Sequence, residues 1–152
     1  MSDERTSYVG KFERHPIRDS VLFGKALVQV IIARLSLSMA GYRKSSRLFR
    51  SAGSDNLDSA IGDPTFPYRA AWAVSKASRI VRTDKPCLAQ ALVLRSLLSR
   101  TGVESTIVIG VKKNGDAIKA HAWVEKEGEV LIGGASSPFR YTVLSPTDSV
   151  EL

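Results

Sequence analysis

The sequence predicts an α+β domain in which helices come first and a small antiparallel sheet follows. The segments with apolar residues at helical spacing come before Gly102, and runs rich in β-branched residues separated by turn signals come after it. The 152 residues, 43% of them hydrophobic and 24% charged, suffice for one compact domain but not for a second full one. We divide the chain into an N-terminal helical segment with a linker, residues 1–66, and a core, residues 67–152.

The N-terminal half predicts two helices joined by a linker. The first covers residues 17–41, and Gly41 marks a bend. Residues 51–67 are polar and concentrate Gly, Asp, Asn and Pro, which is typical of a loop. Helical spacing resumes over residues 69–81.

Basic residues are prominent in this half, and the chain carries a net charge of +7. The apolar run over residues 21–40 is interrupted by Lys25, Gln29 and Arg34, so we expect an amphipathic helix rather than a membrane span of ~20 residues. Three arginines then share one helical face. We call this set, Arg43, Arg47 and Arg50, the basic cluster.

A third helix, residues 88–100, is predicted to follow the only cysteine of the chain, Cys87. Pro86 fixes the entry of the chain into this helix. The unpaired N–H groups and partial positive charge of a helix start favour thiolate over thiol, whose free pKa is ~8.5. The position is typical of a nucleophile, although a lone cysteine can also be a small buried apolar residue.

Two hairpins are predicted after Gly102. Residues 105–111 form one strand, residues 112–115 a turn and residues 118–125 the return strand, in which His121, Trp123 and Glu125 share a face. A second turn at Glu127-Gly128 leads into residues 130–132.

A cysteine at a helix start and a histidine on a downstream strand are the two parts that a thiol hydrolase needs. The imidazole accepts the thiol proton and later donates it to the leaving amine. A Cys-bearing helix packed on a His-bearing sheet is the layout of papain-like and transglutaminase-like thiol enzymes. His121 as a structural histidine is the alternative.

Composition sets further expectations about cofactors and location. One Cys and two His cannot assemble a metal cluster or an internal disulfide, so we expect neither a metal nor another cofactor. The first 16 residues are polar and mixed in charge, unlike a signal peptide. We therefore expect a cytoplasmic protein.

Two blocks occur together in this sequence, the run from Cys87-Leu88-Ala89-Gln90-Ala91-Leu92 to Gly102 and Ala120-His121-Ala122-Trp123-Val124-Glu125, with Ile109-Gly110-Val111 between them. They resemble the lasso peptide leader peptidase family, a bacterial transglutaminase-like group that includes the microcin-processing enzyme. The resemblance spans roughly residues 72–144. It implies a protease that cuts the leader from a ribosomally made precursor peptide, a partner cyclase that closes the freed core into a threaded ring, and a separate leader-recognition protein.

The sequence departs from that family at the third catalytic residue, an Asp on the strand after the His that orients the imidazole. With a two-residue loop at the second turn, Lys126 faces Glu129. His121 then falls opposite Gly134 and has Ile132 among its cross-strand neighbours. The slot expected to hold the Asp is therefore Ile132 or Gly134, and neither side chain can accept a proton.

Other groups are left to orient His121. Glu125 shares its face but lies four residues along the strand, roughly 13 Å away at ~3.3 Å per residue. The remaining candidates are a main-chain carbonyl, a water, or Ser136 or Ser137 after a shift in register.

Two other function classes compete with a peptidase. The net charge of +7 is compatible with a non-enzymatic basic binding module, but the aromatic residues are not interleaved with the basic ones as nucleic-acid binding would require. The basic cluster is either a solvated face or a docking surface for an acidic peptide or protein. A transglutaminase-like acyltransferase would keep the fold and transfer the acyl group to an amine. We predict the peptidase, with Cys87 as nucleophile and His121 as general base and acid.

Overall fold

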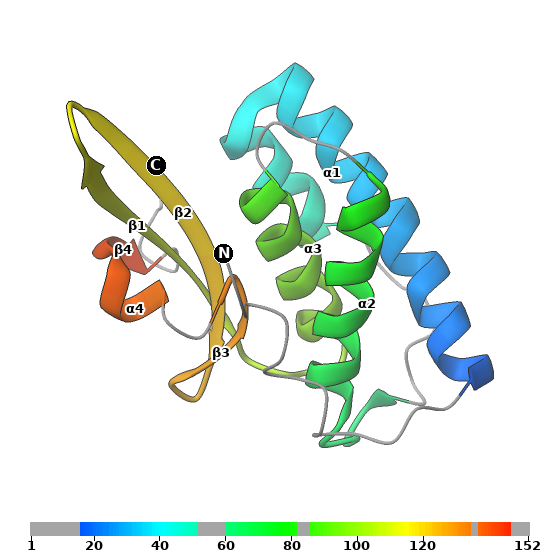
Figure 1. Ribbon diagram of the computed structural model, residues 1–152. Coiled ribbons are helices and arrows are strands. Elements are labelled where there is room, and N and C mark those ends of the chain that lie inside the picture. Colours follow the sequence, from blue (N-terminus) through cyan, green and yellow to red (C-terminus); the bar gives the residue numbers. More distant parts are fainter. Residues whose placement is uncertain (1–15, 52–59, 82–85, 135–136, 147–152) are drawn as a thin grey trace.

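The computed structural model describes residues 16–51, 60–81, 86–134 and 137–146, in which helices pack against one face of a four-stranded antiparallel sheet (Figure 1). The three long helices are α1 (Pro16–Ser51), α2 (Phe66–Ile80) and α3 (Pro86–Arg100), and a short helix, α4 (Ser137–Arg140), lies beyond the sheet. The strands have the order β3-β2-β1-β4. The predicted α+β fold, with helices before a small sheet, is confirmed.

Helix α1 continues from Pro16 to Ser51, so the predicted end of the first helix at residue 41 is wrong. Figure 1 shows α1 changing direction in its cyan part, the region in which the sequence predicts a bend. One face contributes Ala26, Val30 and Ala33, all fully buried, to the core shared with α2, α3 and the sheet. Residues 17–39 have the length and apolar composition of a membrane span, and 28% of their most apolar window is buried inside the domain. The side chains of the basic cluster lie outside the described residues. The division of the chain at residue 66 stays a prediction.

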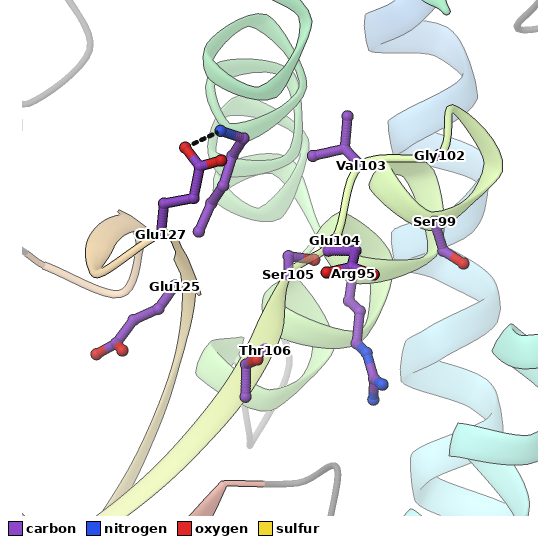
Figure 2. Close-up of a pocket in the computed structure, with 10 residues that line it drawn as sticks. Arg95, Ser99, Gly102, Val103, Glu104, Ser105, Thr106, Glu125 and Glu127 are labelled. Carbon is purple, nitrogen blue, oxygen red and sulfur yellow. Dashed lines mark hydrogen bonds and ion pairs between the residues drawn. The ribbon is translucent and has the colours of Figure 1, made fainter.

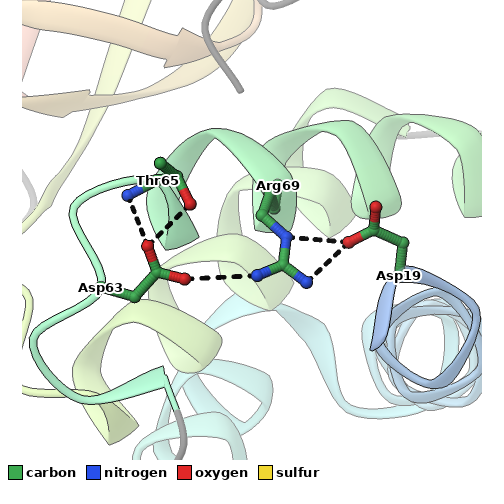
Figure 3. Close-up of polar contacts among 4 residues, drawn as sticks. All are labelled: Asp19, Asp63, Thr65 and Arg69. Atoms are coloured by element: carbon green, nitrogen blue, oxygen red, sulfur yellow. Dashed lines mark hydrogen bonds and ion pairs between the residues drawn. The ribbon is translucent and has the colours of Figure 1, made fainter. Parts of the chain in front are cut away.

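A buried arginine joins α1 to the start of α2 (Figure 3). Nε and Nη2 of Arg69 lie 2.8 and 2.7 Å from Oδ1 of Asp19, and Nη1 lies 3.2 Å from Oδ2 of Asp63. Asp63 also accepts hydrogen bonds from the N–H and hydroxyl of Thr65, at 2.8 and 2.7 Å. Burial raises the pKa of Asp63, but the hydrogen bonds from Thr65 and the charge of Arg69 lower it by a larger amount. The net pKa of this carboxyl is therefore below its usual value. Removing Arg69 would leave Asp19, which is also buried, without these bonds.

The sheet consists of two hairpins and a fourth strand. Strands β1 (Thr106–Asn114) and β2 (Ala117–Lys126) extend to a two-residue turn, so both are longer than predicted. Strand β3 (Glu129–Ile132) follows Glu127 and Gly128, whose φ values of 51° and 81° are those of a type I′ hairpin turn. Strand β4 (Thr142–Pro146), which the sequence did not predict, pairs with the free edge of β1.

A bulge shifts the register between β2 and β3. Glu125 pairs with Val130, but Val124 pairs with Ile132, which leaves Leu131 as the extra residue. The shift places both Leu131 and Ile132 in the core beneath the helices.

The two faces of the sheet bury separate apolar clusters. The face toward the helices joins the main core, whereas the other face forms a small cluster of its own. The members of this second cluster are Val108, Trp123 and Val130, with Tyr141 packed against them.

Candidate active site

Cys87 is the second residue of α3, which begins at Pro86. Proline suits this place because its φ is already helical and the N–H it lacks would have no partner in the helix. The thiol is half-buried. The sequence therefore sets the cysteine within the first turn, among the free N–H groups of the helix.

The structure brings the two predicted residues together. The thiol of Cys87 forms a hydrogen bond with the side chain of His121, which comes from β2. The backbone N–H groups of Ala122 and Leu88 also donate to the sulfur. One strand thus supplies a base and an N–H, and the helix start supplies a second N–H.

These contacts shift the ionisation of the thiol. Burial raises the pKa of Cys87, but the hydrogen bonds with His121 and Ala122 and the charge of His121 lower it by more, so the net pKa of the thiol is below its ordinary value. A lower pKa increases the fraction of thiolate near neutral pH, and the thiolate is the nucleophile.

A main-chain carbonyl orients His121. Nε2 of the imidazole lies 2.7 Å from the carbonyl oxygen of Gly133. A carbonyl can only accept a hydrogen bond, so Nε2 carries the hydrogen, and Nδ1 of the neutral ring is left to accept a proton. A main-chain carbonyl, one of the groups that the sequence left open, is thus the hydrogen-bond acceptor of the His121 ring.

The predicted slot for the third residue, Ile132 or Gly134, is wrong. That prediction assumed a regular ladder beyond Lys126, but the bulge at Leu131 shifts every later residue of β3 by one position. Ile132 consequently lies opposite Val124 and is buried in the core beneath the helices.

Ser137, another residue considered for this role, acts on the same carbonyl. Its hydroxyl donates to the carbonyl oxygen of Gly133 at 2.5 Å. Ser137 and His121 thus share one acceptor, the Gly133 carbonyl oxygen, and Ser137 helps to fix its position. Ser136 lies outside the described residues.

The backbone conformation and close packing at position 133 require a glycine. Its φ is 102°, and a Cβ at this position would lie 2.5 Å from Cβ of Trp123. Sequence reasoning missed this residue because its contribution is a backbone atom. The Gly133-Gly134 pair directly after β3 was the available signal.

One protein family includes a region of this chain that contains the helix of Cys87 and the strand of His121. The model of the Transglutaminase-like superfamily matches residues 24–146, from within α1 to the end of β4. The chain belongs to the transglutaminase-like superfamily. No curated protein and no solved structure shows significant similarity to it. This superfamily includes cysteine proteases and acyltransferases, and the matched region contains both Cys87 and His121.

A cleft of about 1,020 Å³ lies elsewhere on this transglutaminase-like domain (Figure 2). Its walls come from the end of α3, the start of β1 and the β2–β3 turn, where Lys126 and Glu127 form an ion pair at 2.7 Å. Arg95, the lining residue nearest to Cys87 along α3, is eight residues from it, about 12 Å at 1.5 Å per residue, and neither Cys87 nor His121 lines the cleft. The cleft is therefore separate from the Cys87–His121 pair.

Glu125, which shares the strand of His121, bonds to a tryptophan. Glu125 accepts a hydrogen bond from Nε1 of Trp123 at 2.6 Å, on the side of the sheet that carries the small cluster. Among the described residues, no group of three or more His, Cys, Asp or Glu side chains could hold a metal ion.

Proposed function

We propose that this transglutaminase-like protein is a cysteine peptidase that removes the leader peptide from a ribosomally made lasso peptide precursor. The observation that carries the proposal is the hydrogen bond between Cys87 and His121, with the pKa of the thiol lowered. Membership of the superfamily supports thiol chemistry. The resemblance of the segments around both residues to leader peptidases supports the choice of substrate.

Each step of the cleavage can be assigned to an atom of the pair. The thiol of Cys87 transfers its proton to Nδ1 of His121, and the thiolate attacks the carbonyl carbon between leader and core. The carbon–nitrogen bond breaks as the imidazolium gives that proton to the departing core amine. Water then attacks the thioester, loses a proton to His121 and releases the leader as an acid, and the proton returns to the sulfur.

Main-chain N–H groups at the start of α3, including that of Cys87, are proposed to hold the oxyanion. A helix start offers such donors without breaking a hydrogen bond of the helix, because its first N–H groups have no acceptor within the helix.

The Gly133 carbonyl fixes the tautomer of His121 but carries only a partial charge. A carboxylate in this place also stabilises the imidazolium that forms during the reaction. We therefore expect slower cleavage than in relatives that have the Asp.

The proposal includes partners. Leader recognition would belong to a separate small protein, the freed core would pass to a lasso cyclase, and all three would act in the cytoplasm. The basic cluster at the end of α1 is a candidate docking surface for the acidic part of the leader or of the recognition protein.

The test is incubation of the purified protein with the precursor encoded beside its gene, with and without the neighbouring recognition protein, followed by mass spectrometry. The expected products are leader and core whose summed mass exceeds that of the precursor by one water. The matched control is Cys87→Ser, which keeps the shape of the side chain. Cross-linking of the leader to an added amine would instead assign the protein as an acyltransferase, and unchanged cleavage by Cys87→Ser would overturn the thiol mechanism.

A further inference from the structure

Two aromatic rings stack on the imidazole of His121. The Tyr141 ring lies 5.1 Å from it between centroids, at 29° between planes, and the Trp123 ring lies 6.1 Å away at 25°. The two rings are 6.4 Å apart and tilted by 44°. Trp123 is a neighbour on the same strand, but Tyr141 comes from the segment between α4 and β4.

Gly110 provides the space for these rings. It is the residue of β1 that pairs directly with His121. A Cβ on Gly110 would lie 2.7 Å from Cβ of Tyr141 and 2.9 Å from two atoms of the Trp123 ring. Because the position opposite His121 has no side chain, Tyr141 can approach the imidazole.

The same short helix holds Tyr141 and the acceptor of His121. The N–H of Tyr141 donates to the carbonyl of Ser137 at 3.1 Å, and the hydroxyl of Ser137 donates to the carbonyl of Gly133. Lys112 also contacts the ring, with Nζ 4.9 Å from its centroid. The orientation of Tyr141 is thus coupled to that of the Gly133 carbonyl.

We propose that Tyr141 is a positioning residue that keeps the imidazole of His121 in the orientation in which Nε2–H meets the Gly133 carbonyl. An imidazole can turn about its Cβ–Cγ bond, and a neutral carbonyl opposes this rotation less than a carboxylate would. The stacked ring blocks the rotation, shields the hydrogen bond from water and presents a face that attracts a cation. This inference rests on the thiol chemistry proposed above, but not on the identity of the peptide substrate.

The test compares three replacements of Tyr141 with a matched control. Tyr141→Phe keeps the ring, Tyr141→Leu keeps much of the bulk, and Tyr141→Ala removes both. Phe139→Ala removes an aromatic ring that is 91% exposed and only two residues away. Reactivity of Cys87 with iodoacetamide is measured across pH, which is specific because the chain has one cysteine. The tautomer of His121 is measured by ¹⁵N NMR in a His15→Gln background, where it is the only histidine.

We expect Tyr141→Phe and Phe139→Ala to match the wild type. Tyr141→Leu and Tyr141→Ala should lower alkylation near neutral pH by roughly two- to tenfold, the range expected for loss of one aromatic pair, and should mix the tautomers of His121. If Tyr141→Ala does not fold, Tyr141→Leu carries the test.

Two results would overturn the inference. One is a folded Leu or Ala variant with the wild-type pH profile and a single Nε2–H tautomer. The other is an equal loss in Tyr141→Phe, which would assign the effect to the hydroxyl. Neither measurement uses the precursor, so failure of the leader peptidase proposal would be seen separately, as absence of cleavage with normal alkylation.

Discussion

Replacing Gly133 by Ala should disturb both the fold and the orientation of His121. The residue has a φ of 102°, and a side chain held in such a conformation costs about 1–3 kcal/mol. The new Cβ would also lie 2.5 Å from Cβ of Trp123 and 2.9 Å from its Cα, and overpacking of this kind costs a further 1–3 kcal/mol or so. The expected loss is thus about 2–6 kcal/mol, against a typical total stability of about 5–15 kcal/mol.

Gly128→Ala is the matched control. Gly128 has a φ of 81° in the neighbouring hairpin turn, and a Cβ there would meet nothing within 4 Å. This variant therefore carries the conformational cost without the crowding. The difference between the two variants isolates the contact with Trp123.

The assay has two parts, urea denaturation and the rate of Cys87 alkylation by iodoacetamide. Gly133→Ala should lose more stability than Gly128→Ala, and it alone should lower thiol reactivity, because relief of the clash moves the carbonyl away from Nε2 of His121. Equal losses of stability with unchanged reactivity would refute both the crowding at Gly133 and its role as the acceptor.

Three further predictions concern the thiol and the basic cluster. Cys87→Ala should abolish leader removal and leave the denaturation midpoint nearly unchanged, and Cys87→Ser should be nearly inactive; cleavage by either variant at the normal rate would exclude the thiol mechanism. The alkylation rate of the wild type should reach half its maximum at a pH below that of a free thiol, ~8.5, because the folded state favours the thiolate, and His121→Ala should move this point upward. Coincident profiles would show that the pair is uncoupled. Reversal of the basic cluster to Glu should weaken binding of the recognition protein or leader in isothermal titration while thiol reactivity stays constant; unchanged binding would assign the cluster to solubility.

The parts of the site that local sequence patterns encode were predictable. The helical spacing after Cys87 and the alternation around His121 placed the two residues on a helix and a strand that the structure joins by a hydrogen bond. The third group was not predictable in the same way, because every residue offers the same backbone carbonyl. The sequence restricted it to a short set of candidates, one of which was a main-chain carbonyl.

Errors in the predicted fold arose where tertiary packing, rather than local sequence, determines the register of a strand or the extent of an element. The bulge leaves no mark in the sequence, since Leu131 and Ile132 are both apolar and either could face the core. Gly41 lies inside α1 because a glycine costs a helix interior only about 1 kcal/mol, which a long packed helix can absorb. Helix α4 and strand β4 have four and five residues, too few for a periodic pattern to identify.

The bulge also determines what a carboxylate introduced by Ile132→Asp would do. A regular register would set the new carboxylate beside His121 and complete a triad. In the structure Ile132 is 2% exposed, pairs with Val124 and belongs to the apolar core, where an unpaired charge costs roughly 3–5 kcal/mol. Burial should raise the pKa of the new carboxyl above its unfolded value of ~3.9, so the folded state binds the proton more tightly than the unfolded state does. The stability of the variant should therefore fall as the pH rises from the unfolded pKa to the raised folded pKa. Urea denaturation of Ile132→Asp at pH 5 and pH 8 should show this fall, whereas the neutral control Ile132→Asn should lose similar stability at both. Faster single-turnover cleavage by Ile132→Asp with wild-type stability would show instead that the carboxylate reaches the imidazole and that the register at Leu131 is regular.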